Sequence, residues 1–268
     1  MTPRGENAVS TQTHRRPLNA ARVAAASALL LLTFAAVCVA AGRLPSDAAG
    51  ASLAFAAGLL VTPFIASPFE WVVHRYVYHR AAWVLRRIHT VHVAHHHLYF
   101  PTWRYVTGGP ARRIPVLGRG VSRPQGSAAG NAATYLAHFC FYLTIGAVVI
   151  WLPAWRLSQS LPFLLGTLAG TAVISNLFIT VHDAIHRPGS HPFMESRGWF
   201  RFLDEHHYIH HVDTEANVNF LLPLADLLFG TLRRRLTAEE LARHGTRAAA
   251  KSRVVGTGEP ARELLQTA

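Results

Sequence analysis

The chain has 268 residues, half of them hydrophobic, and a formal net charge of +12. Its mean hydropathy of +0.19, with the apolar residues gathered in long blocks, favours a membrane protein with a modest polar part. Nearly all positive charges are arginines that flank those blocks, so we expect membrane topology and no nucleic-acid partner. The two cysteines, Cys38 and Cys140, lie in apolar stretches and are expected to be buried, which leaves histidine and carboxylate for any metal site.

The first half of the chain predicts two membrane-spanning helices after a short polar segment. Residues 1–22 are polar and basic, whereas the blocks 23–42 and 48–69 carry no charge. About 20 apolar residues suffice for a helix to cross a bilayer. A secretory signal peptide is the alternative for the first block. Pro63 and Pro68 are expected to kink the second, which should continue into the residues that follow.

Two further uncharged blocks predict a second pair of spanning helices. They cover residues 131–153 and 161–181, with a turn around Pro153–Arg156 between them. Residues 101–130 are rich in glycine, proline and arginine and are expected to be loop. The fold class is therefore all-α, an integral membrane protein with about four transmembrane helices.

The chain is thus expected to have four parts. Thr237 and Glu240 have the spacing of a capping box, which predicts a short helix within the last part. The parts are a basic N-terminus (1–22), two transmembrane helices (23–69), a histidine-bearing region that includes the second pair (70–231), and a basic, partly disordered C-terminal tail (232–268).

The distribution of basic residues predicts the orientation. With the N-terminus inside, 4 arginines precede residue 23, 9 lie between residues 70 and 130, and 11 basic residues follow residue 181. Only Arg43 and Arg156 then fall outside. Because cytoplasmic segments carry an excess of Lys and Arg, the histidine-rich segments should form a helical cap on the cytoplasmic face, in a bacterial cell membrane by composition.

Histidines are concentrated in two stretches, 74–97 and 182–211, with seven of the 17 in each. Each stretch follows the second helix of a pair, so both emerge on the same side and can meet. Imidazole is the commonest protein metal ligand. Ten of these histidines form four groups at ligand spacing, more than one ion takes, and therefore predict two metal ions. They are His74, His79, His92, His95, His96, His182, His186, His207, His210 and His211.

The spacing within each group predicts how the rings lie. The triplets that begin at His92 and His207 have i, i+3, i+4 spacing, so each should converge on one point from one helix face. The pair that begins at His182 shares a face for the same reason. His74 and His79 are five apart, about 140° around a regular helix, and would need a bend or address different metals. Open nitrogen sites without thiolate favour iron over zinc, copper or manganese.

These four groups resemble the motifs of the membrane fatty acid hydroxylase superfamily, which includes sterol desaturases, fatty acid and sphingolipid hydroxylases and carotenoid hydroxylases. The likeness covers about residues 70–231 and is nearest to the fatty acid 2-hydroxylase branch. It is carried by His74-x4-His79, His92-x2-His95-His96, His182-x3-His186 and His207-x2-His210-His211, with Asn219-Phe220 and Asp226–Thr231 after them.

The resemblance implies an oxidoreductase, a di-iron, O2-dependent monooxygenase that hydroxylates a fatty acyl, sphingolipid or sterol-type lipid in lipid biosynthesis. The ten histidines would be its metal ligands. Electrons would come from a separate donor, a ferredoxin or a b-type cytochrome with its reductase, because residues 1–22 are too short for the fused cytochrome domain of many relatives. A desaturase or carotenoid hydroxylase is the alternative within the superfamily, and a membrane metal transporter or metal-binding protein the alternative from another class.

Two questions stay open at this level. His89 or His97 could replace a ligand of the second motif, since both lie at comparable spacing. Several polar residues could either hydrogen-bond the ligand imidazoles or lie in water: Glu70, Asp183, Asp204, Glu205, Asp213, Asn217 and Asn219.

Overall fold

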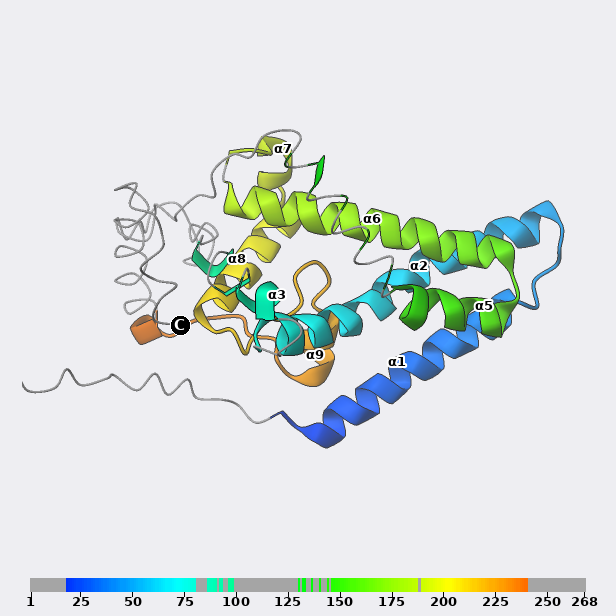
Figure 1. Cartoon of the computed structure of the whole chain (residues 1–268), viewed down its shortest axis with the longest axis horizontal. Helices are drawn as coiled ribbons and strands as arrows, with labels where there is room; N and C mark the ends of the chain where they lie inside the picture. The colour runs from blue at the N-terminus through cyan, green and yellow to red at the C-terminus, as the bar shows by residue number, and fades with distance from the viewer. Residues whose placement is uncertain are drawn as a thin grey trace, which may run out of the picture.

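A computed structural model describes residues 18–80, 86–90, 92–93, 96–98, 130, 132–133, 136, 140, 144, 146–187 and 189–240. Within these residues the chain is helical and has no strand, as the sequence predicts. Three helices are long and apolar enough to cross a membrane, and they run along the long axis of the molecule (Figure 1). They cover Ala20–Ala41, Ala48–Tyr78 and Leu161–His186, with a shorter apolar helix over Ala147–Ser158.

Helix α1 (Ala20–Ala41) begins three residues earlier than predicted, because the side chain of Asn19 caps it by accepting a hydrogen bond from Arg22 N at 3.0 Å. Only 17% of its most apolar window is buried inside the protein, so its leucines face outward as they would toward lipid. Its inner face, including Phe34 and Cys38, belongs to the buried core. This packing favours a retained helix over a signal peptide.

Helix α2 (Ala48–Val73) contains Pro63 and Pro68 in its interior, as expected. It does not stop at residue 69 but continues as the π-helical turn η1 (His74–Tyr78). His79 N donates to His74 O at 3.1 Å, which is the i→i+5 bond of such a turn. The spanning helix therefore leads without a break into the first histidines.

Helix α6 (Leu161–His186) packs closely along α2 through small residues. A Cβ added at Gly58 would lie 2.3 Å from Phe163 O, and one at Gly166 would lie 2.1 Å from Phe55 O. Such backbone approach requires glycine and is common between helices in membranes, where small residues line the contact. The packed α2–α6 pair therefore positions the histidine segments.

The hairpin before α6 differs from the prediction. The π-helical turn η6 (Ala147–Trp151) leads into α5 (Leu152–Ser158), and the chain reverses at Gln159, whose φ is 50°. The expected turn around Pro153 is wrong, because that proline lies in the first turn of α5. The backbone N–H groups of a first turn have no acceptor within the helix, so a proline, which lacks the N–H, is tolerated there. Most of residues 131–145 lies outside the described residues.

The two inter-helix turns lie at one end of the molecule and the histidines at the other (Figure 1). Gly42, after α1, is so close to the end of α5 that an added Cβ would lie 2.3 Å from Ser158 O. Arg43 and Arg156 belong to this end. The opposite end carries η1 and α8 (Gly198–Val212).

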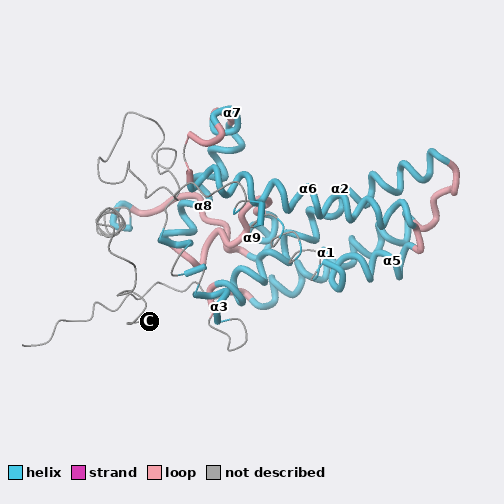
Figure 2. The backbone as a smooth tube through the Cα atoms, turned by 45° about the horizontal axis from the view of Figure 1, so that its top comes forward, coloured by secondary structure: helices cyan, strands magenta, loops and turns pink. Residues whose placement is uncertain are grey.

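The histidine end is built from short elements joined by loops, shown in pink in Figure 2. Two buried clusters hold it to the long helices: one joins α6 to α8 through Ile185 and Phe200, and another joins α2 to α9 through Trp71 and Phe229. The remaining short elements are α3 (Arg86–Thr90), η4 (His96–Leu98), α7 (Pro192–Glu195) and α9 (Leu224–Phe229).

Smaller predictions have mixed outcomes. The capping box is confirmed, since Glu240 N donates to Thr237 Oγ1 at 3.2 Å and Thr237 N donates to Glu240 Oε2 at 2.8 Å. Cys38 is buried as expected, but Cys140 is exposed, because a side chain on an apolar helix can face outward toward lipid. Residues 1–17 and 241–268 lie outside the described residues, as does most of the loop 101–130.

Candidate metal centre

The π-helical turn η1 places His74 and His79 on the same side of the chain. On a regular α-helix they would diverge, but i→i+5 bonding brings residues five apart into register. Their rings stack with centroids 5.0 Å apart. The two histidines therefore belong to one group rather than to different ones.

The first group gathers five imidazoles whose ligand atoms all lie within 4.8 Å of one another: His74, His79, His92, His97 and His210. His92 Nε2 lies 3.0, 3.2 and 3.1 Å from the Nε2 atoms of His74, His79 and His97. One ring nitrogen carries at most one proton, so these contacts cannot all be hydrogen bonds. Imidazole nitrogens about 2.0–2.1 Å from a shared ion would lie about 3 Å apart, which is the spacing seen here.

The second group contains His96, His182, His186 and His207, again within 4.8 Å. His207 Nε2 lies 3.1 Å from the Nε2 atoms of both His186 and His211. His96 Nε2 is buried and has no hydrogen-bond partner among the described residues. A buried nitrogen without a partner costs free energy in the empty protein, which fits a role as a metal ligand.

A third set, His96, His97 and His211, lies between the two groups and connects them. The rings of His97 and His211 stack with centroids 4.4 Å apart. His96 belongs to this set and to the second group, and His97 to this set and the first. The two groups are therefore adjacent parts of one continuous centre.

Helix α8 contributes to both groups, which corrects the expectation that its triplet converges on one point. His210 joins the first group and His207 the second, whereas His211 joins the connecting set. At about 100° per residue, positions i+3 and i+4 lie about 60° behind and 40° ahead of position i, so the rings spread to both sides. The pair His182 and His186 lies in one group, as predicted.

In the second motif, His92 and His96 lie in the groups as expected, and His97 joins them. The chain is π-helical at His92 and forms the 3-10 turn η4 at His96 and His97, so regular helix spacing does not apply. His97 enters the first group, while His89 Nδ1 donates to Tyr78 O at 2.9 Å and joins neither. His95 lies outside the described residues. Of the two open alternatives, the geometry supports His97.

Two backbone carbonyls orient ligand rings of the first group. His74 Nδ1 donates to Val218 O at 2.5 Å, and His210 Nδ1 donates to Ala216 O at 2.9 Å. A carbonyl oxygen can only accept, so in both rings the proton is on Nδ1 and the Nε2 lone pair faces the group. Partners of this kind fix the tautomer of metal-binding histidines.

The loop that carries these carbonyls is held by two carboxylates. Asp226 accepts hydrogen bonds from Val218 N at 2.9 Å and Asn219 N at 2.8 Å. Glu70, one turn before the π-helical turn, accepts from Phe220 N at 2.7 Å. Asp226 opens the Asp226–Thr231 segment that contributes to the family resemblance, but its spacing along the chain does not indicate that it holds this loop.

The other polar candidates support the surrounding structure. Asn217 Nδ2 donates to the backbone carbonyl of His206 at 3.0 Å. Asn219 Nδ2 donates to Ser67 O at 2.7 Å, which ties the loop to α2. Two of the aspartates form ion pairs: Asp183 with Arg187, and Asp213 with Arg233.

Burial keeps the imidazoles neutral. It lowers the pKa of His79 to about 2, with the neighbouring His210 adding to the effect. It lowers the pKa of His210 to about 4, where the Ala216 carbonyl works in the opposite direction. The pKa is also well below 6.5, through burial and adjacent imidazoles, for His92, His96, His97, His207 and His211. Neutral imidazole is the form that binds metals.

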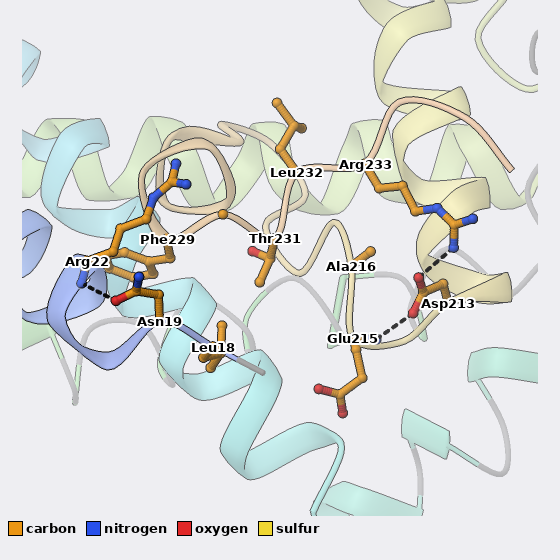
Figure 3. Close-up of a pocket in the computed structure, with 11 residues that line it drawn as sticks. Leu18, Asn19, Arg22, Asp213, Glu215, Ala216, Phe229, Thr231, Leu232 and Arg233 are labelled. Carbon is orange, nitrogen blue, oxygen red and sulfur yellow. Dashed lines mark hydrogen bonds and ion pairs between the residues drawn. The ribbon is translucent and has the colours of Figure 1, made fainter. Parts of the chain in front are cut away.

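A cavity of about 240 Å³ is lined on one side by residues of the segment 213–216 (Figure 3). Ala216, whose carbonyl holds His210, forms part of its wall. Arg22 reaches it from α1 and donates to Leu227 O at 2.7 Å, and Arg233 pairs with Asp213 at 2.7 Å. The charged side chains of Arg22 and Arg233 thus connect α1 and the C-terminal segment to the histidine end.

Comparisons of the chain with family models, curated proteins and solved structures find no match. The chain has buried histidine clusters that could hold metal ions, at one end of helices suited to a membrane.

Proposed function

We propose that the protein is a membrane-bound di-iron oxidoreductase that uses O2 to hydroxylate a lipid. The observation that carries the proposal is the pair of adjacent, buried, all-imidazole groups joined by a connecting set. A structural site for a single ion needs about four ligands, whereas ten described histidines gather here. Because the connecting set shares His96 with one group and His97 with the other, two ions bound in the two groups would be adjacent and could act together.

The ligand chemistry is compatible with iron. The donors are neutral nitrogens with no thiolate among the described ligands, a set that can hold iron, zinc or copper, and we propose iron because O2 activation needs a redox-active metal. Two bound iron ions would supply the O2 activation that insertion of oxygen into an unactivated C–H bond requires. The overall reaction consumes the C–H substrate, O2, two electrons and two protons, and yields the alcohol and water.

The residues of this chain have three tasks in the proposed reaction. The imidazoles bind the ions, and the carbonyls of Ala216 and Val218 orient His210 and His74. The buried cap excludes water from the centre. The outward-facing apolar helices keep the centre next to bilayer lipid, and we propose a fatty acyl, sphingolipid or sterol-type substrate.

The electrons would come from a separate donor, a ferredoxin or a b-type cytochrome with its reductase. The positive-inside distribution supports a cytoplasmic position for the histidine end, in a bacterial cell membrane. A transporter would place its ligands near the middle of the membrane. The described groups instead lie at one end of the long helices (Figure 1), which favours the enzyme.

The test is incorporation of ¹⁸O from ¹⁸O2 into lipids of cells that express the protein. Wild type should yield a lipid heavier by one ¹⁸O, and His210→Ala and His186→Ala, one from each group, should abolish it. His89→Ala removes a nearby histidine outside both groups and should retain it. A new double bond without ¹⁸O would indicate a desaturase. Metal uptake into vesicles without O2 consumption would indicate a transporter and overturn the proposal.

A further inference from the structure

Three large aromatic side chains are exposed at the histidine end, on the short helix α7 and on α8. Phe193 on α7 is 73% exposed, and Trp199 and Phe202 on α8 are 49% and 47% exposed. Trp199 and Phe202 are three residues apart, so they share one helix face. Three exposed aromatic side chains within ten residues of chain favour an interaction surface over singly scattered surface residues.

Positive charge lies on and beside this face. Arg197 lies over the ring of Phe193 at 4.2 Å, and Arg201 is exposed on the flank of α8, about 100° around the helix from Phe202. The only acidic residue between positions 192 and 202 is Glu195, which is buried and accepts hydrogen bonds from the backbone of Gly189 and His191. One arginine therefore lies over the aromatic side chains and a second beside them, and no carboxylate is exposed between positions 192 and 202.

The position of the face connects it to the membrane-facing surface. In Figures 1 and 2, α7 projects sideways from the bundle near the C-terminal end of α6. The connection from α6 to α7 spans only residues 187–191, and α6 exposes Val173 and Leu177 along its outer face. A segment beside the end of a spanning helix lies at the depth of the lipid headgroups.

We propose that the face formed by Phe193, Arg197, Trp199 and Phe202, with Arg201 at its flank, binds the phospholipid interface of the membrane that the long helices span. The aromatic rings enter the boundary between headgroups and acyl chains, where Trp is enriched, and the arginines bind anionic phosphates. Because α8 carries four buried histidines, this contact fixes the depth at which the histidine centre lies. The inference does not depend on the bound metal or on the reaction.

The experiment places an environment-sensitive fluorophore on single cysteines in a Cys38→Ala, Cys140→Ala background, with the full chain in lipid nanodiscs. Phe193→Cys is the test position. Leu165→Cys, on the outer face of α6, is the bilayer control, and Ala238→Cys, exposed on the C-terminal segment, is the aqueous control. Spin-labelled lipids with the label near the headgroup or deep in the chain report depth, and iodide reports exposure to water.

The label at position 193 should be quenched most by the shallow lipid label, and protected from iodide relative to position 238. The mole fraction of phosphatidylglycerol that half-maximally protects it should rise about fivefold for Arg197→Gln and again for Arg201→Gln. Iodide quenching equal to that at position 238 would overturn the proposal. Protection that requires more than one chain per nanodisc would also overturn it, because it would indicate a second copy as the partner.

Discussion

His97 shows how a single residue decides the assignment of the second motif. The sequence offers four closely spaced histidines, and regular helix geometry favours His92, His95 and His96. The described residues are π-helical at His92 and form a 3-10 turn at His96 and His97, and His97 Nε2 lies 3.1 Å from His92 Nε2. Residue spacing predicts a shared face only while the backbone stays regular.

The register can be tested by comparing two neighbouring alanine variants. His97→Ala removes a nitrogen from both the first group and the connecting set, so we expect it to lose at least one bound iron per chain and the lipid oxidation. His89→Ala, whose ring bonds a backbone carbonyl instead, should keep both. Metal analysis of the purified variants measures this. If His95→Ala loses iron while His97→Ala keeps it, the register described here is wrong.

The site could be predicted from the sequence to the extent that it depends on residue type. Nine of the ten proposed ligands lie among the described residues, and all nine lie in the histidine groups. Their division between groups could not be predicted, because it depends on how the rings spread from α8 and on the π-helical turn at His74. The role of Asp226 was not predicted either, since it holds backbone amides that the sequence does not bring together.

At the scale of elements, the loop 216–220 connects the fold to the centre. Its carbonyls orient His74 and His210, and its amides are held by the carboxylates of Asp226 and Glu70. The loop therefore fixes the positions of the ligand rings relative to α9 and α2. Outer partners of this kind tune metal affinity without touching the ion.

Asp226→Asn tests this arrangement. The amide nitrogen cannot accept a hydrogen bond, so one of the two backbone amides that Asp226 holds loses its partner. We expect iron affinity to fall about 10–100-fold, as for other outer-partner changes. Chelator competition measures the affinity, and circular dichroism monitors helix content. Glu239→Gln, an exposed carboxylate, is the control; an equal effect there, or none at Asp226, would contradict the role.

The α2–α6 contact makes a separate prediction at this scale. Gly58→Ala brings a methyl group to 2.3 Å from Phe163 O, and the backbones must separate. Such overpacking costs roughly 1–3 kcal/mol, so the thermal transition in detergent should fall. Gly146→Ala is the matched control, because its nearest atoms, on Trp151, are 3.8 Å away. Equal stability of the two variants would show that close packing does not hold these helices together.

For the whole molecule, the helical class and the long apolar helices follow from hydropathy alone, because burial in lipid needs only length and composition. The hairpin boundaries do not follow so directly. Pro153 suggested a turn, but proline is compatible with the first turn of a helix, and the chain reverses at Gln159 instead. The separation of turns and histidines to opposite ends agrees with the charge pattern of the sequence.

The orientation of the molecule can be tested by labelling in intact cells. Ser46→Cys lies in the turn between α1 and α2, and Ala238→Cys lies at the histidine end, both exposed. In the cysteine-free background, a thiol reagent that cannot cross membranes should label position 46 in intact cells, and position 238 only after lysis. The reverse pattern would place the histidine end outside.

The central claim is that the two histidine groups hold two iron ions in one centre. Metal analysis of the purified, membrane-extracted protein tests it most directly. We predict two iron ions per chain in the wild type, and loss of iron together with lipid oxidation when His210 or His186 is replaced by alanine. A wild-type protein that oxidises lipid with no bound iron, or one that binds zinc alone, would contradict the account.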